Sequence, residues 1–437
     1  MRALLELLRR HRRGEPVGIY SVCSAHPLVL RSALQHAHAL GAEALIEATS
    51  NQVNQDGGYT GLRPAGFRDV VWRMADEIGL PRERVLLGGD HLGPNCWQAQ
   101  PAVSALQRAG TMVSEYVRAG FRKIHLDCSM SCSDDPRALT DELIAERAAR
   151  LCAQAESAWQ SAGGEAPVYV IGSEVPAPGG AQEALQELAV TEPRIAHASI
   201  AAHRAAFTRL GLEAAWERVI ALVVQPGVEF DQDRVVEYAP ARAQRLSASL
   251  AAEPQLVFEA HSTDYQSAES LAALVRDHFA ILKVGPALTF ALREAVWALD
   301  QIEREWLGEE KSSHVRATIL AAMREDPTHW RKYYHGSGRT LELQLAYSLS
   351  DRIRYSWPVP AVTRALTHLE ASFDADTPPL SLLRQYLPSA YDAVRRGEIR
   401  PSAQNLIVQH VRLVLSDYSQ ACSQPAAVGA QIGGNTQ

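Results

Sequence analysis

The sequence lacks a hydrophobic segment long enough to cross a membrane. No run of about 18 apolar residues occurs anywhere in its 437 residues. The first residues, MRALLELLRRHRRGEP, contain several leucines, but Glu6 and a group of arginines interrupt them. This pattern predicts an amphipathic helix over residues 1–16 and not a secretory signal peptide. We therefore expect a cytoplasmic protein without a membrane partner.

Cysteines are also few, and there is no excess of positive charge. The six cysteines show no repeated metal-finger spacing, which favours reduced thiols over a disulfide framework. A net charge of −7 argues against nucleic acid as the main partner. A G-x-x-x-x-G-K-[ST] loop is absent, so we expect no nucleotide cofactor.

Eight short apolar runs are present, and they alternate with helical patterns. They cover residues 17–22, 44–48, 85–87, 123–126, 168–171, 219–224, 256–258 and 281–284. Runs of this kind are typical of parallel strands buried on both faces, and eight such units close a (β/α)8 TIM barrel. An open doubly wound sheet is the alternative. We expect the barrel over residues 17–307, a C-terminal helical extension over 308–421 and a disordered tail over 422–437.

Polar residues cluster directly after the predicted strands, where a barrel carries its reactive groups. The loop from Glu47 to Tyr59 is dense in amides and hydroxyls, and this composition suits sugar hydroxyls; a solvated surface loop is the alternative. Lys283 is interpreted as an anion contact, a Schiff-base amine or a structural lysine. The candidate substrate-binding residues are Ser24, Glu47, Asn51, Asn54, Gln55, Asp127, Ser262, Thr263 and Lys283.

Four residues at strand ends could bind a metal or move protons. Asp90 and His91 end the third strand, Glu174 follows the fifth and His261 follows the seventh. An imidazole beside a carboxylate is suited to metal ligation and acid–base chemistry, although Glu174 could also form a structural salt bridge. We expect these four side chains to converge on one cavity that holds a divalent metal.

Two polar segments stand out in the predicted extension, at residues 333–339 and 350–357. The second ends a helix predicted over residues 341–354 and contains two arginines. These segments could cover the barrel mouth as a lid or contact another subunit, including a second copy of this chain. The sequence leaves both alternatives open.

The strand-end motifs together resemble the Z subunit family of D-tagatose-1,6-bisphosphate aldolase. The matching segments are EATSNQVNQDGGYTG, GGDHLGPNCW, HLDCSMSC, IGSEVPAPGG, FEAHSTDYQ and LKVGPALTFALREA. The resemblance runs from about residue 16 to residue 357 and continues more weakly through the helical tail. It implies a class II aldolase-like barrel in galactitol or N-acetylgalactosamine catabolism, through the tagatose 6-phosphate pathway. It also implies an accessory subunit that supports the activity and stability of a separate catalytic Y subunit.

A more distant similarity to catalytic class II aldolases implies roles for single residues. Asp90 resembles their proton-transferring aspartate, His91 and His261 resemble their metal ligands, and Glu174 resembles their glutamate near the metal. Gln225 stands where those enzymes have a further metal histidine, and it is a weaker candidate ligand. Because zinc prefers nitrogen and sulfur donors, an amide there favours a harder ion such as Mn²⁺ or Mg²⁺.

The phosphate-binding motifs of those aldolases are also replaced. Ser262-Thr263-Asp264 stands in place of a glycine-rich loop, and residues 285–288 replace an Asn-x-Asp-Thr motif. These departures imply little zinc-dependent aldolase activity from this chain alone.

Two main hypotheses follow for function. The first is an accessory subunit that binds the catalytic aldolase subunit and a small sugar or sugar phosphate. The second is a free-standing enzyme that uses a divalent metal to epimerise or cleave a ketose or ketose phosphate by retro-aldol chemistry. A purely structural barrel is a third alternative, although it would not require so many polar residues at the strand ends.

Overall fold

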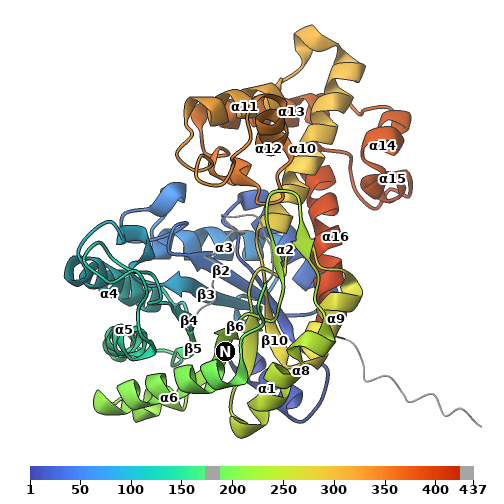
Figure 1. Ribbon diagram of the computed structural model, residues 1–437. Helices are drawn as coiled ribbons and strands as arrows, with labels where there is room; N and C mark the ends of the chain where they lie inside the picture. The colour runs from blue at the N-terminus through green and yellow to red at the C-terminus, as the bar shows by residue number, and fades with distance from the viewer. Residues whose placement is uncertain (173–187, 424–437) are drawn as a thin grey trace, which may run out of the picture.

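Eight parallel strands form a closed barrel in the computed structural model, which describes residues 1–172 and 188–423. Their order around the barrel is β1-β10-β9-β6-β5-β4-β3-β2 (Figure 1). The strands are β1 (Ile19–Val22), β2 (Ala44–Thr49), β3 (Val85–Leu92), β4 (Lys123–Leu126), β5 (Val168–Gly172), β6 (Val219–Val224), β9 (Val257–Ala260) and β10 (Phe279–Val284). Because β1 pairs with both β2 and β10, the predicted TIM barrel is confirmed and the open sheet is excluded.

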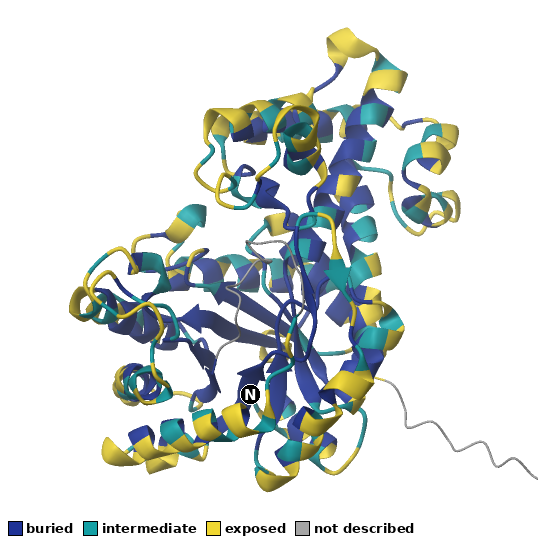
Figure 2. Cartoon of the chain, in the orientation of Figure 1, coloured by how far each residue is buried: buried dark blue, intermediate teal, exposed yellow. Residues whose placement is uncertain are grey.

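Helices surround the barrel and bury its strands (Figure 2). Proline at the first position starts several of these helices, and in two of them a left-handed glycine, Gly41 or Gly79, ends the same helix, as expected for the two ends of a helix. The wall includes α2 (Pro27–Leu40), α3 (Pro64–Ile78), α4 (Ala102–Arg118), α5 (Asp141–Ala162), α6 (Pro193–Arg209), α7 (Glu213–Trp216), α8 (Pro240–Ser249) and α9 (Ala268–Arg276). A short antiparallel ribbon, β7 (Glu229–Phe230) and β8 (Val235–Val236), lies outside the barrel sheet.

The N-terminal helix α1 (Arg2–Arg12) closes the end of the barrel opposite the strand C-termini. Its buried residues Leu4 and Leu8 pack in one apolar cluster with residues from the barrel strands, such as Leu45 and Leu86. The opposite face of α1 carries arginines and Glu6. An amphipathic helix is suited to this position because one face meets the barrel interior and the other meets water.

The chain after β10 leaves the barrel and then returns to it (Figure 1). Helix α10 (Pro286–Leu307) leads away to α11 (Val315–Glu325), α12 (Gly338–Tyr347), α13 (Pro360–Ala375), α14 (Leu380–Tyr386) and α15 (Pro388–Arg395). Helix α16 (Ala403–Ser423) lies against the barrel wall, where Ser32 Oγ donates to Val408 O over 3.0 Å and the Gly18 amide donates to Cys422 O over 3.0 Å. The last helix of the described residues is therefore part of the barrel wall.

Helix α12 is shorter than the sequence predicts. It ends at Tyr347, whereas the pattern predicts a helix to residue 354. Asp351 has a φ of 42°, in the left-handed region that a right-handed helix cannot contain. The chain continues as a short 3₁₀ helix, η6 (Arg352–Tyr355), which faces the barrel mouth.

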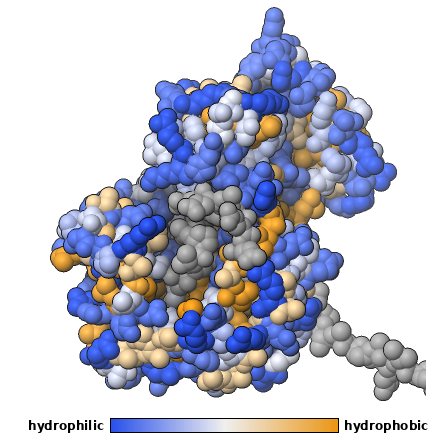
Figure 3. Space-filling view, viewed as in Figure 1, coloured by the Kyte–Doolittle hydropathy of each residue, from blue (hydrophilic) through white to orange (hydrophobic). Residues whose placement is uncertain are grey.

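Hydrophilic residues cover most of the extension on the face shown in Figure 3. Within residues 1–172 and 188–423, no helix combines the length and the apolar composition that a membrane crossing requires.

Candidate active site at the barrel mouth

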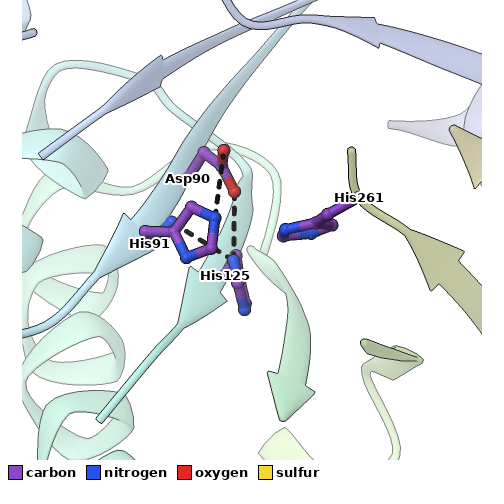
Figure 4. A group of neighbouring side chains, drawn as sticks. All are labelled: Asp90, His91, His125 and His261. Atoms are coloured by element: carbon purple, nitrogen blue, oxygen red, sulfur yellow. Dashed lines mark hydrogen bonds and ion pairs between the residues drawn. The ribbon is translucent and has the colours of Figure 1, made fainter. Parts of the chain in front are cut away.

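Three histidines and one aspartate meet at the C-terminal end of the barrel strands (Figure 4). Asp90 and His91 lie at the end of β3, His125 lies in β4 and His261 follows β9. All four are buried, and one ligand atom from each lies within 4.8 Å of the others. The structure therefore brings Asp90, His91 and His261 together, as their strand-end positions predict. Glu174, the fourth residue of the predicted group, lies outside the described residues.

The backbone is strained where two of the cavity-lining side chains enter the site. His91 and Ser262 have φ values of 48° and 51°, in the left-handed region that residues other than glycine rarely adopt. Strain of this kind costs on the order of 1–3 kcal/mol and is concentrated at functional sites. Glycine is also needed at position 88 in the same strand as His91, because a Cβ there would lie 2.7 Å from Cγ of the buried Glu47 side chain.

Carboxylates support two of the three imidazoles. Asp127 Oδ2 lies 2.8 Å from Nδ1 of His91, and Glu259 Oε1 lies 3.0 Å from Nε2 of His261. With a proton on Nδ1, His91 keeps Nε2 as a lone-pair donor toward the cavity, and such a carboxylate–histidine pair is the usual support of a metal-binding imidazole. Asp127 is expected from the sequence to contact substrate, but it lies behind His91, and Ser129 donates to its other oxygen.

The ionisation of Asp127 agrees with this supporting role. Burial alone would raise the pKa of Asp127, but the hydrogen bond from His91 and the charges around it hold that pKa below its ordinary value. Asp127 therefore accepts hydrogen bonds as a carboxylate at neutral pH.

His125 has chain partners at both ring nitrogens. Nε2 lies 2.9 Å from the carbonyl oxygen of Gly172, and Nδ1 lies 3.0 Å from Oδ1 of Asp90 and 3.2 Å from the backbone nitrogen of His91. Burial lowers the pKa of His125, and the hydrogen bond to Asp90 opposes this shift. These contacts fit a residue that holds Asp90 in position. They do not fit a metal ligand, because neither ring nitrogen is left for an ion. The sequence reasoning did not select His125, although its alternation with Asp127 places it on the inward face of β4.

A buried ionic network lies beneath the histidines. Nζ of Lys123 is 2.7 Å from both Glu47 Oε1 and Glu259 Oε2. Nζ of Lys283 is 2.8 Å from Asp90 Oδ1 and 3.5 Å from Glu259 Oε1, and it also pairs with Glu47. The chain contains 4 lysines against 39 arginines, yet two of the lysines lie here. A compact ammonium group can contact several carboxylates in a narrow barrel, where a planar guanidinium would not fit as well.

This network sets the charges of Lys283 and Asp90. Burial alone would lower the pKa of Lys283, but Asp90, Glu47 and Glu259 hold that pKa well above its ordinary value. Burial would likewise raise the pKa of Asp90, but His91, Lys283 and the hydrogen bond to His125 hold it well below the ordinary value. Lys283 is thus a permanent cation, which disfavours the Schiff-base interpretation because that chemistry needs a neutral amine.

A cavity lies against the histidine cluster, and part of the predicted substrate-binding set lines it. The members that do so are Ser24, Asn51, Ser262 and Lys283, and Asp90, His91 and His261 line the same cavity. Cys23, Gln52, Tyr59 and Asn95 line it too and were not selected from the sequence. Hydroxyls and amides around a cluster that could hold a metal ion are suited to a polyhydroxylated ligand.

The other predicted residues have structural partners instead. Glu47 belongs to the buried ionic network. Asn54 Oδ1 accepts from the amides of residues 56 and 58, and Gln55 Nε2 donates to the carbonyl oxygen of Arg108. Thr263 Oγ1 donates to the carbonyl oxygen of Lys283 over 2.6 Å. These four side chains stabilise the strand ends and loops and do not line the cavity.

Gln225 also differs from its predicted role. Its Oε1 accepts hydrogen bonds from the amides of Gly227 and Val228, at 2.8 and 3.0 Å. An oxygen that already holds this turn closed is a poor metal donor. We therefore correct the interpretation of Gln225 from a weak metal ligand to a residue that shapes the turn after β6.

The helical extension completes the cavity wall. Arg354 and Tyr355 of η6 line the same space as His91 and His261. The Tyr355 ring meets the Tyr59 ring edge-on, at 4.7 Å between centroids. Residues of the segment 350–357 therefore lie over the barrel mouth, which is one of the two positions predicted for it.

Asp264 caps the helix that follows the last strand. Its Oδ1 accepts from the amide of Gly285 over 2.9 Å and from the amide of Ala287 over 2.8 Å. These amides belong to the N-terminal end of α10. Burial raises the pKa of Asp264 to about 6.

Comparison with known proteins relates the chain to sugar-phosphate enzymes. The sequence matches the family described as D-tagatose-1,6-bisphosphate aldolase subunit GatZ/KbaZ-like over residues 4–423. A crystal structure of a probable tagatose 6 phosphate kinase from Sinorhizobium meliloti 1021 is 49% identical with a TM-score of 0.85, and the match covers 93% of this chain and 100% of that one.

Two aldolases are much more distant. The YdjI aldolase from Escherichia coli K12 is 11% identical with a TM-score of 0.41, covering 85% of this chain and 98% of that one. The fructose-bisphosphate aldolase from Campylobacter jejuni is 12% identical with a TM-score of 0.42, covering 84% of this chain and 92% of that one.

Proposed function

The chain belongs to the GatZ/KbaZ-like family of D-tagatose-1,6-bisphosphate aldolase subunits, and from this premise we propose that it is itself a divalent-metal-dependent enzyme. The proposed reaction breaks and re-forms a carbon–carbon bond of a ketose or ketose phosphate. One observation carries the proposal: Asp90 lies beside two imidazoles, and each imidazole has its own supporting carboxylate. A barrel with a purely structural or accessory role has no need of this arrangement.

The donor set fits a divalent metal. His91 and His261 would supply imidazole nitrogens, and the Asp90 carboxylate would remain beside the ion for proton transfer. Imidazole donors suit zinc or another first-row ion such as manganese. The third histidine, His125, has partners at both nitrogens and would serve by holding Asp90 in place.

The charge of the buried network also fits such an ion. The network contains four carboxylates (Asp90, Asp127, Glu47 and Glu259) and two lysines (Lys123 and Lys283). With neutral imidazoles, these six residues have a formal charge of −2. Uncompensated charge is costly in a buried site. A divalent cation would neutralise this charge.

The chain's own residues are placed for retro-aldol proton transfer. Ionised Asp90 would take the proton from the C4 hydroxyl of the sugar as the C3–C4 bond breaks, so that C4 becomes an aldehyde and the bonding electrons pass to the enediolate at C2 and C3. A bound metal would act as a Lewis acid that stabilises this negative charge. Re-addition at the opposite face of the aldehyde, with the proton returned from Asp90 to the C4 oxygen, gives the C4 epimer. If Asp90 returns that proton to C3 instead, the enediolate becomes a ketone, and release of the two fragments gives net aldol cleavage.

Turnover by the isolated chain tests this proposal. We expect the metal-loaded protein to convert D-tagatose 6-phosphate into its C4 epimer, or to cleave D-tagatose 1,6-bisphosphate into two triose phosphates, with the products identified by NMR. Asp90→Asn should lower kcat by about 10²–10⁴-fold, because it removes the proton acceptor. No turnover with any divalent ion would contradict the proposal.

Metal binding can be measured without turnover. Asp127→Asn keeps the shape of the residue but weakens the support of His91, and loss of such a support typically lowers metal affinity by about 10–100-fold. Direct titration of the metal-free protein with Zn²⁺ or Mn²⁺ measures this change. A matched control is Asp134→Asn, since Asp134 accepts from the Ala102 amide outside the site, and it should leave the affinity unchanged.

The accessory role is the second candidate, and the family description as an aldolase subunit supports it. In that case the chain would bind a separate catalytic subunit of a tagatose-bisphosphate aldolase and turn over little by itself. Assays of the two chains separately and together distinguish the candidates. An accessory chain should still activate its partner when it carries Asp90→Asn, whereas an enzyme should lose its own activity.

A further inference from the structure

Two permanent cations line the cavity, and their surroundings differ. Lys283 is paired with Glu47, Asp90 and Glu259. Arg354 donates from Nη1 to the carbonyl oxygens of Ser350 and Asp351, and no described carboxylate lies within ion-pair distance of it. The positive charge of Lys283 is therefore compensated by direct ion pairs. Arg354 has only longer-range interactions with the carboxyl groups of Asp264 and Asp351, so its charge can form a direct contact with a ligand.

The guanidinium group of Arg354 is held in place before any ligand arrives. Its two backbone contacts fix one end of the fork, and its carbon Cζ lies 4.9 Å from the centre of the Tyr355 ring. That ring is stacked on His329 at 4.3 Å and meets Tyr59 from the barrel loop at 4.7 Å. A cation that is ordered by its own fold loses less entropy when it binds an anion.

The usual anion site of a barrel is filled in this chain. Barrels of this kind often bind phosphate near the loops after their last strands and a helix N-terminus. Here Asp264 takes the amides of Gly285 and Ala287 and places a carboxyl group where the phosphate would lie. An anionic ligand would have to be recognised elsewhere in the cavity, and Arg354 supplies the unpaired charge.

We infer that Arg354 binds the anionic end of the substrate, so that the helical extension and not the barrel selects a charged sugar. The ligand class is a ketose that carries a phosphate or carboxylate at the end far from the carbonyl group. Ser24, Tyr59 and Thr289 line the cavity together with Arg354 and offer hydroxyls to the same group. This inference rests on the proposed function, because it names the substrate class of that site.

Binding measurements test the inference independently of catalysis. Calorimetry of the full-length, metal-loaded protein would compare D-tagatose, D-tagatose 6-phosphate and D-tagaturonate for the wild type, Arg354→Gln and Arg354→Lys. We expect the wild type to bind at least one anionic sugar about 10-fold or more tightly than D-tagatose. Arg354→Gln should weaken that binding by about 10–100-fold, as expected for loss of a charge-assisted hydrogen bond. Its affinity for D-tagatose should stay within about twofold of the wild-type affinity. Arg354→Lys should recover part of the affinity.

Arg339→Gln is the matched control, because Arg339 is exposed on the same extension, and it should bind all three sugars like the wild type. Tighter binding of the uronate than of the phosphate would identify a carboxylate as the preferred anion. The inference is overturned if the wild type does not prefer an anionic sugar or if no sugar binds. It is also overturned if Arg354→Gln lowers the affinity for D-tagatose and for the anionic sugars by the same factor. Anion-selective binding without turnover would support the role of Arg354 and contradict the proposed enzymatic function.

Discussion

The two ends of the barrel interior are built from the same strands but have opposite chemistry. At the N-terminal end, Leu4 and Leu8 of α1 pack with strand residues such as Leu45 and Leu86 in a wholly apolar cluster. At the C-terminal end, the next inward positions carry Glu47, Lys123, His125 and Glu259, all of them fully buried. The first end gains stability from removing apolar surface from water. The second end places charges where burial is costly.

This difference shows where the molecule gives up stability for chemistry. Replacing buried ion pairs by apolar residues of similar volume is often neutral or stabilising, so folding alone does not explain two lysines and four carboxylates in the barrel. Reactive groups at the C-terminal ends of strands are the general rule for this fold. The apolar end holds the barrel closed, and the ionic end holds Asp90 and the histidines in their positions.

The largest expected effect comes from breaking the ionic end at Lys123. Lys123→Met leaves the buried carboxylates of Glu47 and Glu259 with Lys283 as their one remaining shared cation among the described residues, and loss of one member of a buried ion pair typically costs about 3–5 kcal/mol. Urea denaturation would measure the free energy of unfolding. Lys311→Met, at an exposed lysine, is the control and should change it by less than about 0.5 kcal/mol. A similarly small effect at Lys123 would show that the network does not depend on that charge.

A somewhat smaller effect is expected when the apolar end is broken at Leu8. Leu8 is fully buried in the apolar cluster between α1 and the barrel strands, and Leu→Ala changes in a core cost about 2–5 kcal/mol. We expect Leu8→Ala to fall in the lower half of this range, because a terminal helix can shift to close part of the cavity. Metal affinity should stay unchanged, in contrast to the effect of Asp127→Asn. Arg2→Ala, which alters a side chain that is 98% exposed, should change neither property, and a loss of metal affinity in Leu8→Ala would mean that the two ends are coupled.

The contrast between the two ends also explains what the sequence could predict. The eight apolar runs predict the barrel, and residues 123–126 and 219–224 match β4 and β6 residue for residue. Strand β3 is predicted only over residues 85–87, but it continues to Leu92. The missing part contains Asp90 and His91, because hydrophobicity stops marking a strand at the point where its inward residues become polar.

Contacts between distant segments are the part that sequence could not supply. Asp90, His91 and His261 could be selected because each lies at a strand end, and parallel strands in a barrel end on the same rim. The approach of Arg354 to the cavity depends on the left-handed turn at Asp351, which no local pattern announces. The position of α16 on the barrel wall depends on contacts such as Tyr418 with Thr263, 155 residues apart. An amphipathic pattern predicts that one face is buried, but it does not identify the partner.

The smallest effect is expected at Asp264, which caps α10 at the C-terminal rim of the barrel. Burial raises the pKa of Asp264 to about 6 from its ordinary value of 3.8, so the folded chain holds this proton more tightly than the unfolded chain does. Its stabilising contribution is therefore complete below about pH 4 and is lost as the pH rises through about 6. Asp264→Asn imitates the protonated form and keeps an oxygen for the two amides of α10. At pH 7 the variant should be more stable than the wild type by about 1–3 kcal/mol, and at pH 4 the two should be nearly equal. Denaturation at both pH values measures the difference in free energy of unfolding between the wild type and the variant. Other carboxylates titrate alike in the two proteins, so their contributions cancel in this difference. An equal difference at the two pH values would mean that Asp264 is ionised throughout, and the rim would then tolerate a buried charge as the centre of the barrel does.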